Sequence, residues 1–155
     1  MTKQDIYQRA FRIIGNKTPL KANCGLLCDC ACCKGDENTG MVLFPEEETV
    51  LNVKTKDGVR LAVCDGTCDR ATRPLACRIF PFFPKIDENG KISVILDARG
   101  AHICPMISHA DEIVFDKSFL RRVKRAGRLL SKDAEIRTFL KESTEEIEMH
   151  RRFFK

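Results

Sequence analysis

The sequence predicts one small α+β domain: a cysteine-rich, metal-stapled core with short hairpins, an N-terminal helix and two C-terminal helices. Three observations lead to this prediction. Apolar residues recur at helical spacing near both ends of the chain, alternating runs flank turn residues in the middle, and nine cysteines gather between residues 24 and 104. A length of 155 residues fits a single domain over 1–155 that can bury a core.

The N-terminal helix is the first predicted element. Its apolar residues recur at helical spacing over residues 6–14. Thr2 and Asp5 are three positions apart, as in a capping pair, and Gly15 is a residue type that commonly ends a helix. Further along, Pro45 is followed by three glutamates, which predicts a short second helix because acids are favoured near the positive end of a helix.

Two hairpins are expected between these helices and the C-terminal region. Alternating residues over 51–55 and 59–63 flank Lys56-Asp57-Gly58, and an Asp-Gly pair favours a tight hairpin turn. The turn-forming run at 87–90 leads into a second alternating strand over 91–97, which predicts another hairpin.

Two helices are predicted after Asp116, and both are expected to pack over the sheet. Their apolar positions are Phe119, Leu120, Val123, Ala126, Leu129 and Leu130 in the first, then Ile136, Phe139, Leu140, Ile147, Phe153 and Phe154 in the second. Ser131 is expected to cap the second helix, since serine is a preferred residue at a helix start.

The positive charge lies entirely in these basic C-terminal helices, over 116–154. Residues 115–155 hold 12 Lys and Arg against 7 Asp and Glu, a surplus of five that equals the whole net charge of +5. Such a surface suits an acidic protein partner, although a charged helix face often meets only water. Nucleic acid is not expected as a partner, because glutamates are interleaved with the basic residues in this region.

The cysteines are expected to bind metal in a cytoplasmic protein. No run approaches the roughly 18 apolar residues that a membrane span requires, so no membrane association is expected. The N-terminus also lacks the pattern of an export signal. Thiols stay reduced in a cytosol, and nine is an odd number, so thiolate–metal ligation is favoured over a disulfide scaffold.

The spacing of the cysteines supports metal ligation without choosing between zinc and iron. Ligand pairs two to four residues apart are typical of such sites. Several pairs have this spacing, among them Cys24 with Cys28, Cys28 with Cys32, and Cys64 with Cys68. Two four-thiolate sites would use eight of the nine cysteines, whereas one iron–sulfur cluster would use four and leave enough for a zinc site.

Three further residues remain open as ligands. Cys30 is the candidate for the spare cysteine. His102 and His109 lie in a loop near Cys104, where each is either a ligand or base, or a surface or packing residue.

The motifs resemble the YkgJ-type cysteine-cluster family, which is described as a zinc- or iron-chelating domain and is distantly similar to the flagellin lysine N-methylases. The resemblance covers about residues 20–108, the cysteine core, through the run from Cys24 to Cys33, Arg73-Pro74-Leu75-Ala76-Cys77-Arg78-Ile79-Phe80-Pro81 and Cys104-Pro105. The family usually has Cys-x-x-Cys-x-x-Cys-Cys, so the irregular first group departs from its pattern. The ligands that the resemblance implies are Cys24, Cys28, Cys32, Cys33, Cys77 and Cys104, with Cys64 and Cys68 as partners.

The function expected from these features is metal binding by clustered cysteine thiolates, which would hold zinc or an iron–sulfur cluster. The alternative, implied by the resemblance, is an iron–sulfur-dependent enzyme similar to protein lysine N-methyltransferases. No glycine-rich phosphate loop or serine hydrolase elbow is present to indicate another reaction. Arg73 and Arg78 flank Cys77, where they either offset thiolate charge or pack and cap the backbone of a sharp turn.

Overall fold

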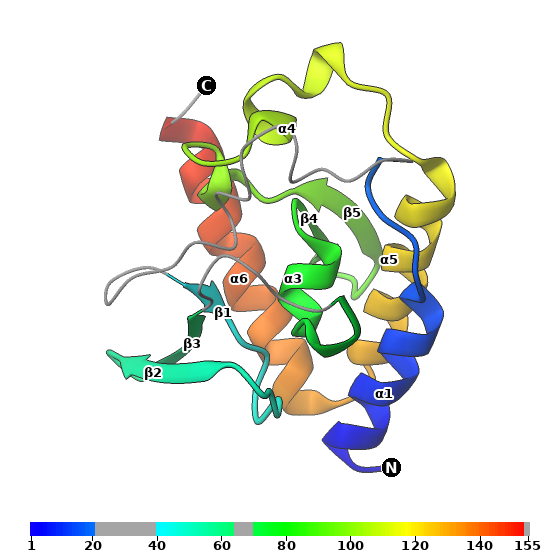
Figure 1. Ribbon diagram of the computed structural model, residues 1–155, viewed down its shortest axis with the longest axis vertical. Coiled ribbons are helices and arrows are strands. Elements are labelled where there is room, and N and C mark those ends of the chain that lie inside the picture. The colour runs from blue at the N-terminus through cyan, green and yellow to red at the C-terminus, as the bar shows by residue number, and fades with distance from the viewer. Residues whose placement is uncertain (21–39, 64–69, 154–155) are drawn as a thin grey trace.

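The α+β class is confirmed by the computed structural model, which describes residues 1–20, 40–63 and 70–153. Figure 1 shows helices α1, α5 and α6 around a central two-stranded hairpin, with a small three-stranded sheet at one side. Among the described helices, none is both long and apolar enough to cross a membrane.

Helix α1 spans Lys3–Ile14, as the sequence predicts. The Thr2 hydroxyl accepts a hydrogen bond from the Asp5 amide, and the Asp5 carboxylate accepts one from the Thr2 amide, which completes the capping box. The helix ends at Gly15, whose φ of 57° is unfavourable for a residue with a side chain. Its inner face is buried against the core.

The second predicted hairpin forms the centre of the molecule. Strands β4 (Phe82–Ile86) and β5 (Ile92–Leu96) are antiparallel, and their register runs from Phe82 opposite Leu96 to Ile86 opposite Ile92. Both C-terminal helices, α5 (Lys117–Leu130) and α6 (Ala134–Phe153), pack on this hairpin. The expected packing of two helices over a sheet is therefore confirmed.

One hydrophobic core joins these elements. It buries the inner faces of α1, β4, β5, α5 and α6. The ring of Phe44, which comes from the segment after β1, stacks at 6.0 Å from Phe83 and lies 4.9 Å from Phe139 and 6.1 Å from Tyr7. Phe44 therefore anchors the cysteine-flanking part of the chain to the helical body.

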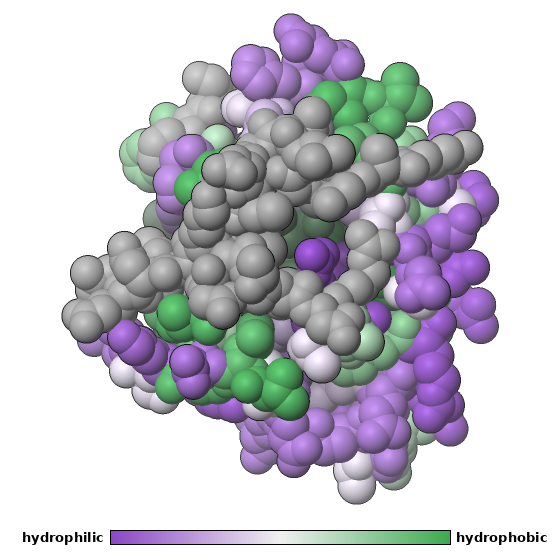
Figure 2. All heavy atoms as spheres, viewed as in Figure 1, coloured by the Kyte–Doolittle hydropathy of each residue, from purple (hydrophilic) through white to green (hydrophobic). Residues whose placement is uncertain are grey.

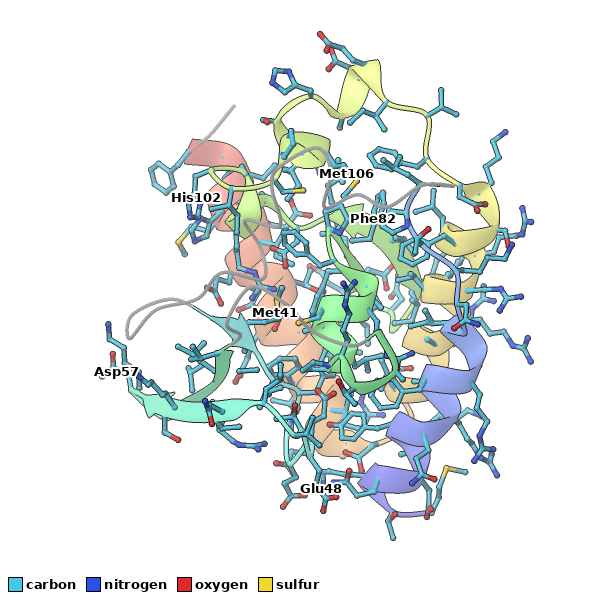
Figure 3. All side chains as sticks on the ribbon, in the orientation of Figure 1. Met41, Glu48, Asp57, Phe82, His102 and Met106 are labelled. Atoms are coloured by element: carbon cyan, nitrogen blue, oxygen red, sulfur yellow. The ribbon has the colours of Figure 1, made fainter. Side chains whose placement is uncertain are left out.

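The first predicted hairpin belongs to a three-stranded sheet. Its strands are β1 (Met41–Val42), β2 (Asn52–Lys56) and β3 (Val59–Val63), in the order β1-β3-β2. Asp57 and Gly58 form the two-residue turn with φ of 53° and 79°, the conformation that favours an Asp-Gly pair. Figure 3 shows Asp57 at the tip of this hairpin, which projects from the body of the molecule.

Short helical segments replace the loops expected around the later cysteines. Their bounds are η2 Arg70–Thr72, α3 Leu75–Ile79, η3 Ala98–Gly100, α4 Pro105–Ser108 and η4 Ala110–Glu112. The short helix predicted after Pro45 is wrong, because residues 45 and 46 form a turn in which Glu46 has a φ of 57°. The next residue, Glu47, is buried in the interior.

The cap predicted for the last helix is also wrong. Ser131 ends α5, since its amide donates to the Gly127 carbonyl at 3.0 Å. The residue that caps α6 is Asp133, whose Oδ1 accepts hydrogen bonds from the amides of Glu135 at 2.9 Å and Ile136 at 3.0 Å. Phe153, predicted to lie in the apolar stripe, is 78% exposed because α6 extends past the core there.

Replacing Gly127 with alanine is expected to lower the free energy of unfolding by about 1–2 kcal/mol, although alanine is the better helix former by about 1 kcal/mol. The added Cβ would lie 2.6 Å from Cβ of Pro84 and 3.0 Å from Cγ2 of Ile92, and the proline ring cannot turn aside. Denaturant unfolding of Gly127→Ala, with the exposed neighbour Arg128→Ala as control, measures this change. A Gly127→Ala protein as stable as the wild type would contradict close packing of α5 on the hairpin.

Candidate functional site

Two of the eight predicted metal ligands, Cys77 and Cys104, lie in the described part of the chain. The other six lie outside the described residues, as does Cys30: these six are Cys24, Cys28, Cys32, Cys33, Cys64 and Cys68. The site is therefore built from the surroundings of Cys77 and Cys104 and from the described residues that flank the other cysteines.

Cys77 is the third residue of α3 and is half-buried. The helix begins after Pro74, whose side chain has no hydrogen-bond acceptor to cap it, and ends at Phe80. Its neighbours Leu75 and Ile79 are buried in the core at 0% and 2% exposure, so α3 is held by apolar packing on both sides of the cysteine.

The buried carboxylate of Glu47 supplies the cap that Pro74 lacks. Its Oε2 accepts a hydrogen bond from the Leu75 amide at 2.7 Å, and its Oε1 accepts one from the Phe44 amide at 3.3 Å. The residue is 0% exposed. One carboxylate therefore connects the start of the cysteine-bearing helix to the segment that follows β1, and its negative charge faces the positive end of α3.

Two opposing effects act on the ionisation of Glu47. Burial raises the pKa of its carboxyl group above the ordinary value, whereas the amide hydrogen bonds from Leu75 and Phe44 and the charges of Arg60 and Arg78 act in the opposite direction. Arg60 also donates from Nη2 to the Glu47 carbonyl at 3.0 Å. The Nη1 group of Arg60 is buried and has no hydrogen-bond partner within the described ranges.

Arg78 caps the backbone beside Cys77, in agreement with one of its two predicted roles. Its Nε donates to the Arg73 carbonyl at 3.1 Å, and its Nη2 donates to the Ala71 carbonyl at 2.9 Å. The guanidinium also lies 4.7 Å from the centre of the Phe11 ring on α1. Arg78 therefore fixes the turn that leads into α3.

Cys104 is buried, with 3% exposure, and stands at the N-cap of α4. Its amide donates to the Gly100 carbonyl at 3.0 Å, while its own carbonyl accepts from the Ile107 amide at 3.0 Å. Pro105 occupies the first helical position, where a missing N–H costs nothing. The backbone on both sides of Cys104 is thus held by hydrogen bonds.

The segments that carry Cys77 and Cys104 contact each other. A Cβ built on Gly100 would lie 2.6 Å from Cζ of Phe80 and 3.2 Å from Cδ1 of Ile107, so the Phe80 ring presses directly on the Gly100 backbone. Phe80 ends the helix of Cys77, and the carbonyl of Gly100 accepts the hydrogen bond from Cys104. Figure 1 shows α3 in front of the β4–β5 hairpin with α4 beyond its end.

The residues that flank the other two cysteine groups also lie together. Met41 pairs with Ala62, which sets Gly40 and Val63 at the same end of the β1–β3 ladder. A Cβ on Gly40 would lie 2.8 Å from the Ala62 carbonyl oxygen, so this approach suits glycine. Gly40 borders the segment of residues 21–39, Val63 borders that of residues 64–69, and α3 contacts β1.

Neither predicted histidine joins a metal-binding group within the described ranges. His102 and His109 are both exposed, and Nδ1 of His109 lies 3.9 Å from Oε2 of Glu112 in the same short segment. Over residues 1–20, 40–63 and 70–153, no three His, Cys, Asp or Glu side chains are grouped so as to hold a metal ion. Figure 3 shows His102 near the C-terminal end of α6, on the rim of the molecule.

Glu47 is the important residue that the sequence did not reveal. Its neighbours Glu46 and Glu48 are exposed, and the local sequence does not distinguish the three. The difference arises from Leu75, a hydrogen-bond partner 28 positions away.

Comparison with known proteins gives no relative: no family model, curated protein or solved structure matches this chain. The resemblance to the YkgJ-type family therefore depends on the sequence motifs alone.

Replacing Glu47 with alanine is expected to lower the free energy of unfolding by about 2–4 kcal/mol, because two buried amides would lose their acceptor. Urea unfolding of Glu47→Ala measures the effect, and Glu48→Ala, which removes an exposed carboxylate from the same segment, is the matched control. Equal stability of the two variants would mean that the Glu47 carboxylate does not hold α3.

Proposed function

We propose that this protein binds metal through its clustered cysteine thiolates and holds zinc or an iron–sulfur cluster that fastens its central segments together. Cys24, Cys28, Cys32, Cys33, Cys64, Cys68, Cys77 and Cys104 are the proposed ligands. Their number and close spacing suit four-thiolate zinc or a thiolate-bound cluster. Cys30 is the proposed spare.

The observation that supports this proposal most is the convergence of the described residues around the cysteine groups. Gly40 and Val63, which flank the segments containing seven of the nine cysteines, lie at one end of the same ladder. The helix of Cys77 contacts the adjoining strand β1, and Phe80 at its end contacts Gly100 near Cys104. Thiolates that reach a metal from several segments need anchor points of this kind.

The charge and rigidity of these anchors fit the same proposal. Four thiolates on one zinc ion leave a net charge of about −2, so nearby cations favour such a site. The positive charges of Arg60 and Arg78 both act to lower the pKa of the Glu47 carboxyl group, which caps α3. The backbones next to Cys77 and Cys104 are fixed by hydrogen bonds from Arg78 and to Gly100. Fixed ligand backbones reduce the entropy lost when metal binds.

Elemental analysis and an ultraviolet–visible spectrum of protein purified without oxygen test the proposal. We expect zinc in a colourless protein, or iron and sulfide with a broad band near roughly 400 nm. Cys77→Ser should lower the bound metal per chain, and Cys30→Ser should leave it unchanged. Protein that contains neither metal, or a loss with Cys30→Ser alone, would contradict the proposed ligands.

Removal of the metal is expected to act locally. Treatment with a chelator should speed amide hydrogen exchange in β1, β3 and α3, since these elements adjoin the cysteine groups, while α5 and α6 keep their protection through apolar packing on β4 and β5. Hydrogen-exchange mass spectrometry before and after chelation measures this pattern. Unchanged exchange in all five elements would argue against a structural role for the metal.

A further inference from the structure

Helices α1 and α5 lie side by side and together form one strongly basic face. Helix α5 contains six Lys and Arg and no Asp or Glu, and α1 contains three Lys and Arg and one Asp. Helix α6, by contrast, contains five Glu against four Lys and Arg. The glutamates of the C-terminal region therefore lie on α6, and the tertiary structure places the acid-free helix α5 beside α1 (Figure 1).

Seven cations of this α1–α5 face are exposed. The exposed members are Arg9, Arg12, Lys17, Lys117, Arg121, Arg125 and Arg128. None of them forms a salt bridge with a residue in the described ranges; the ion pairs there involve Lys3, Lys85, Arg99 and His109. Figure 2 shows a hydrophilic surface along the edge where Figure 1 places α1 and α5, and Figure 3 shows nitrogen-tipped side chains projecting from it.

Two acids lie at the ends of these helices, and Asp5 also interacts electrostatically with Arg9. Asp5 accepts hydrogen bonds from Thr2, and Asp116 accepts one from the Ser118 amide, so each serves as part of a helix cap. Arg122 donates from Nη1 to the Ile13 carbonyl at 3.0 Å and ties α5 to α1. The spacing of the cations across the two helices is therefore set by the fold.

The composition of the face favours phosphates over other acidic partners. None of the large exposed apolar side chains of the described residues belongs to α1 or α5; they are Met1, Val50, Val53, Val59, Ile103, Val114, Met149 and Phe153. Protein interfaces depend on such side chains at their centre, and membrane-bound helices insert them into lipid. Single-stranded nucleic acid requires exposed aromatic rings, whereas Tyr7 is buried and Phe11 lies beneath Arg78.

Duplex DNA matches both the charge and the length of the face. Helix α5 has 14 residues and is about 21 Å long, a length over which one strand of a duplex presents roughly six phosphates. Arginine predominates among the exposed cations and binds phosphate through paired N–H groups. We propose that the α1–α5 face binds the phosphate backbone of double-stranded DNA without reading its sequence. Nucleic acid is not expected from the sequence because of interleaved glutamates, and these glutamates lie on α6.

Fluorescence anisotropy of a labelled DNA duplex with the 155-residue protein as purified tests this inference. We expect a dissociation constant on the order of 1–100 μM at physiological salt, with a plot of log K against log salt that has a slope of roughly −3 to −5. The triple variant Arg121→Glu, Arg125→Glu, Arg128→Glu should bind about tenfold more weakly or worse. The control variant Lys54→Glu, Lys91→Glu, Lys141→Glu has the same change of net charge at exposed positions outside the face, and it should retain most of the affinity.

A second variant tests the part played by α1. Arg9→Gln with Arg12→Gln leaves α5 unchanged and should also weaken binding, because both arginines lie on the face. Circular dichroism establishes that each variant is folded. Equal losses in the two triple variants, full affinity in Arg9→Gln/Arg12→Gln, or equal binding to polyglutamate or anionic lipid vesicles would overturn the proposal.

Discussion

The hydrogen bond between the Glu47 carboxylate and the Leu75 amide is the constraint on which the position of the Cys77 helix depends. It connects two segments 28 positions apart and caps a helix whose own first residues include no capping side chain. The same carboxylate binds the amide of Phe44, and the Phe44 ring packs in the aromatic core. Through these contacts, the short helix of Cys77 is fixed relative to α1, the hairpin and α6.

Apolar packing and polar contacts stabilise different parts of the molecule. The helices close on β4 and β5 through buried side chains, and this part needs no metal to explain its stability. The three-stranded sheet has less apolar support, since every residue of β2 is exposed. The position of this sheet therefore depends on a few contacts with the rest of the molecule: the packing of Phe44 and the hydrogen bonds of Arg60 and Glu47. A metal bound by the adjoining cysteines would act at the same place.

The separation of charge in the fold gives the molecule two unlike sides. Lys3 forms ion pairs with Glu46 and Glu135 near the start of α6, so the acids of that region have a partner. The other cations along α1 and α5 outnumber the acids of these two helices, since α5 contains no Asp or Glu and α1 contains only Asp5. Charges of one sign on neighbouring helices repel and lower stability slightly. An anionic partner would relieve this repulsion.

The sequence by itself determined the features whose causes are local. The Thr2 and Asp5 capping box, the Asp57-Gly58 turn and the apolar stripes of α1, α5 and α6 depend on residues within a few positions of one another, so pattern was sufficient to predict them. The metal site that the spacing of the cysteines predicts stays a prediction. Tertiary structure alone decided that Glu47 is buried while Glu46 and Glu48 are exposed, that Asp133 rather than Ser131 caps α6, and that the basic residues of α5 lie beside those of α1. Each of these outcomes depends on how segments far apart in the sequence are placed relative to one another. A pattern of neighbouring residues does not contain that information.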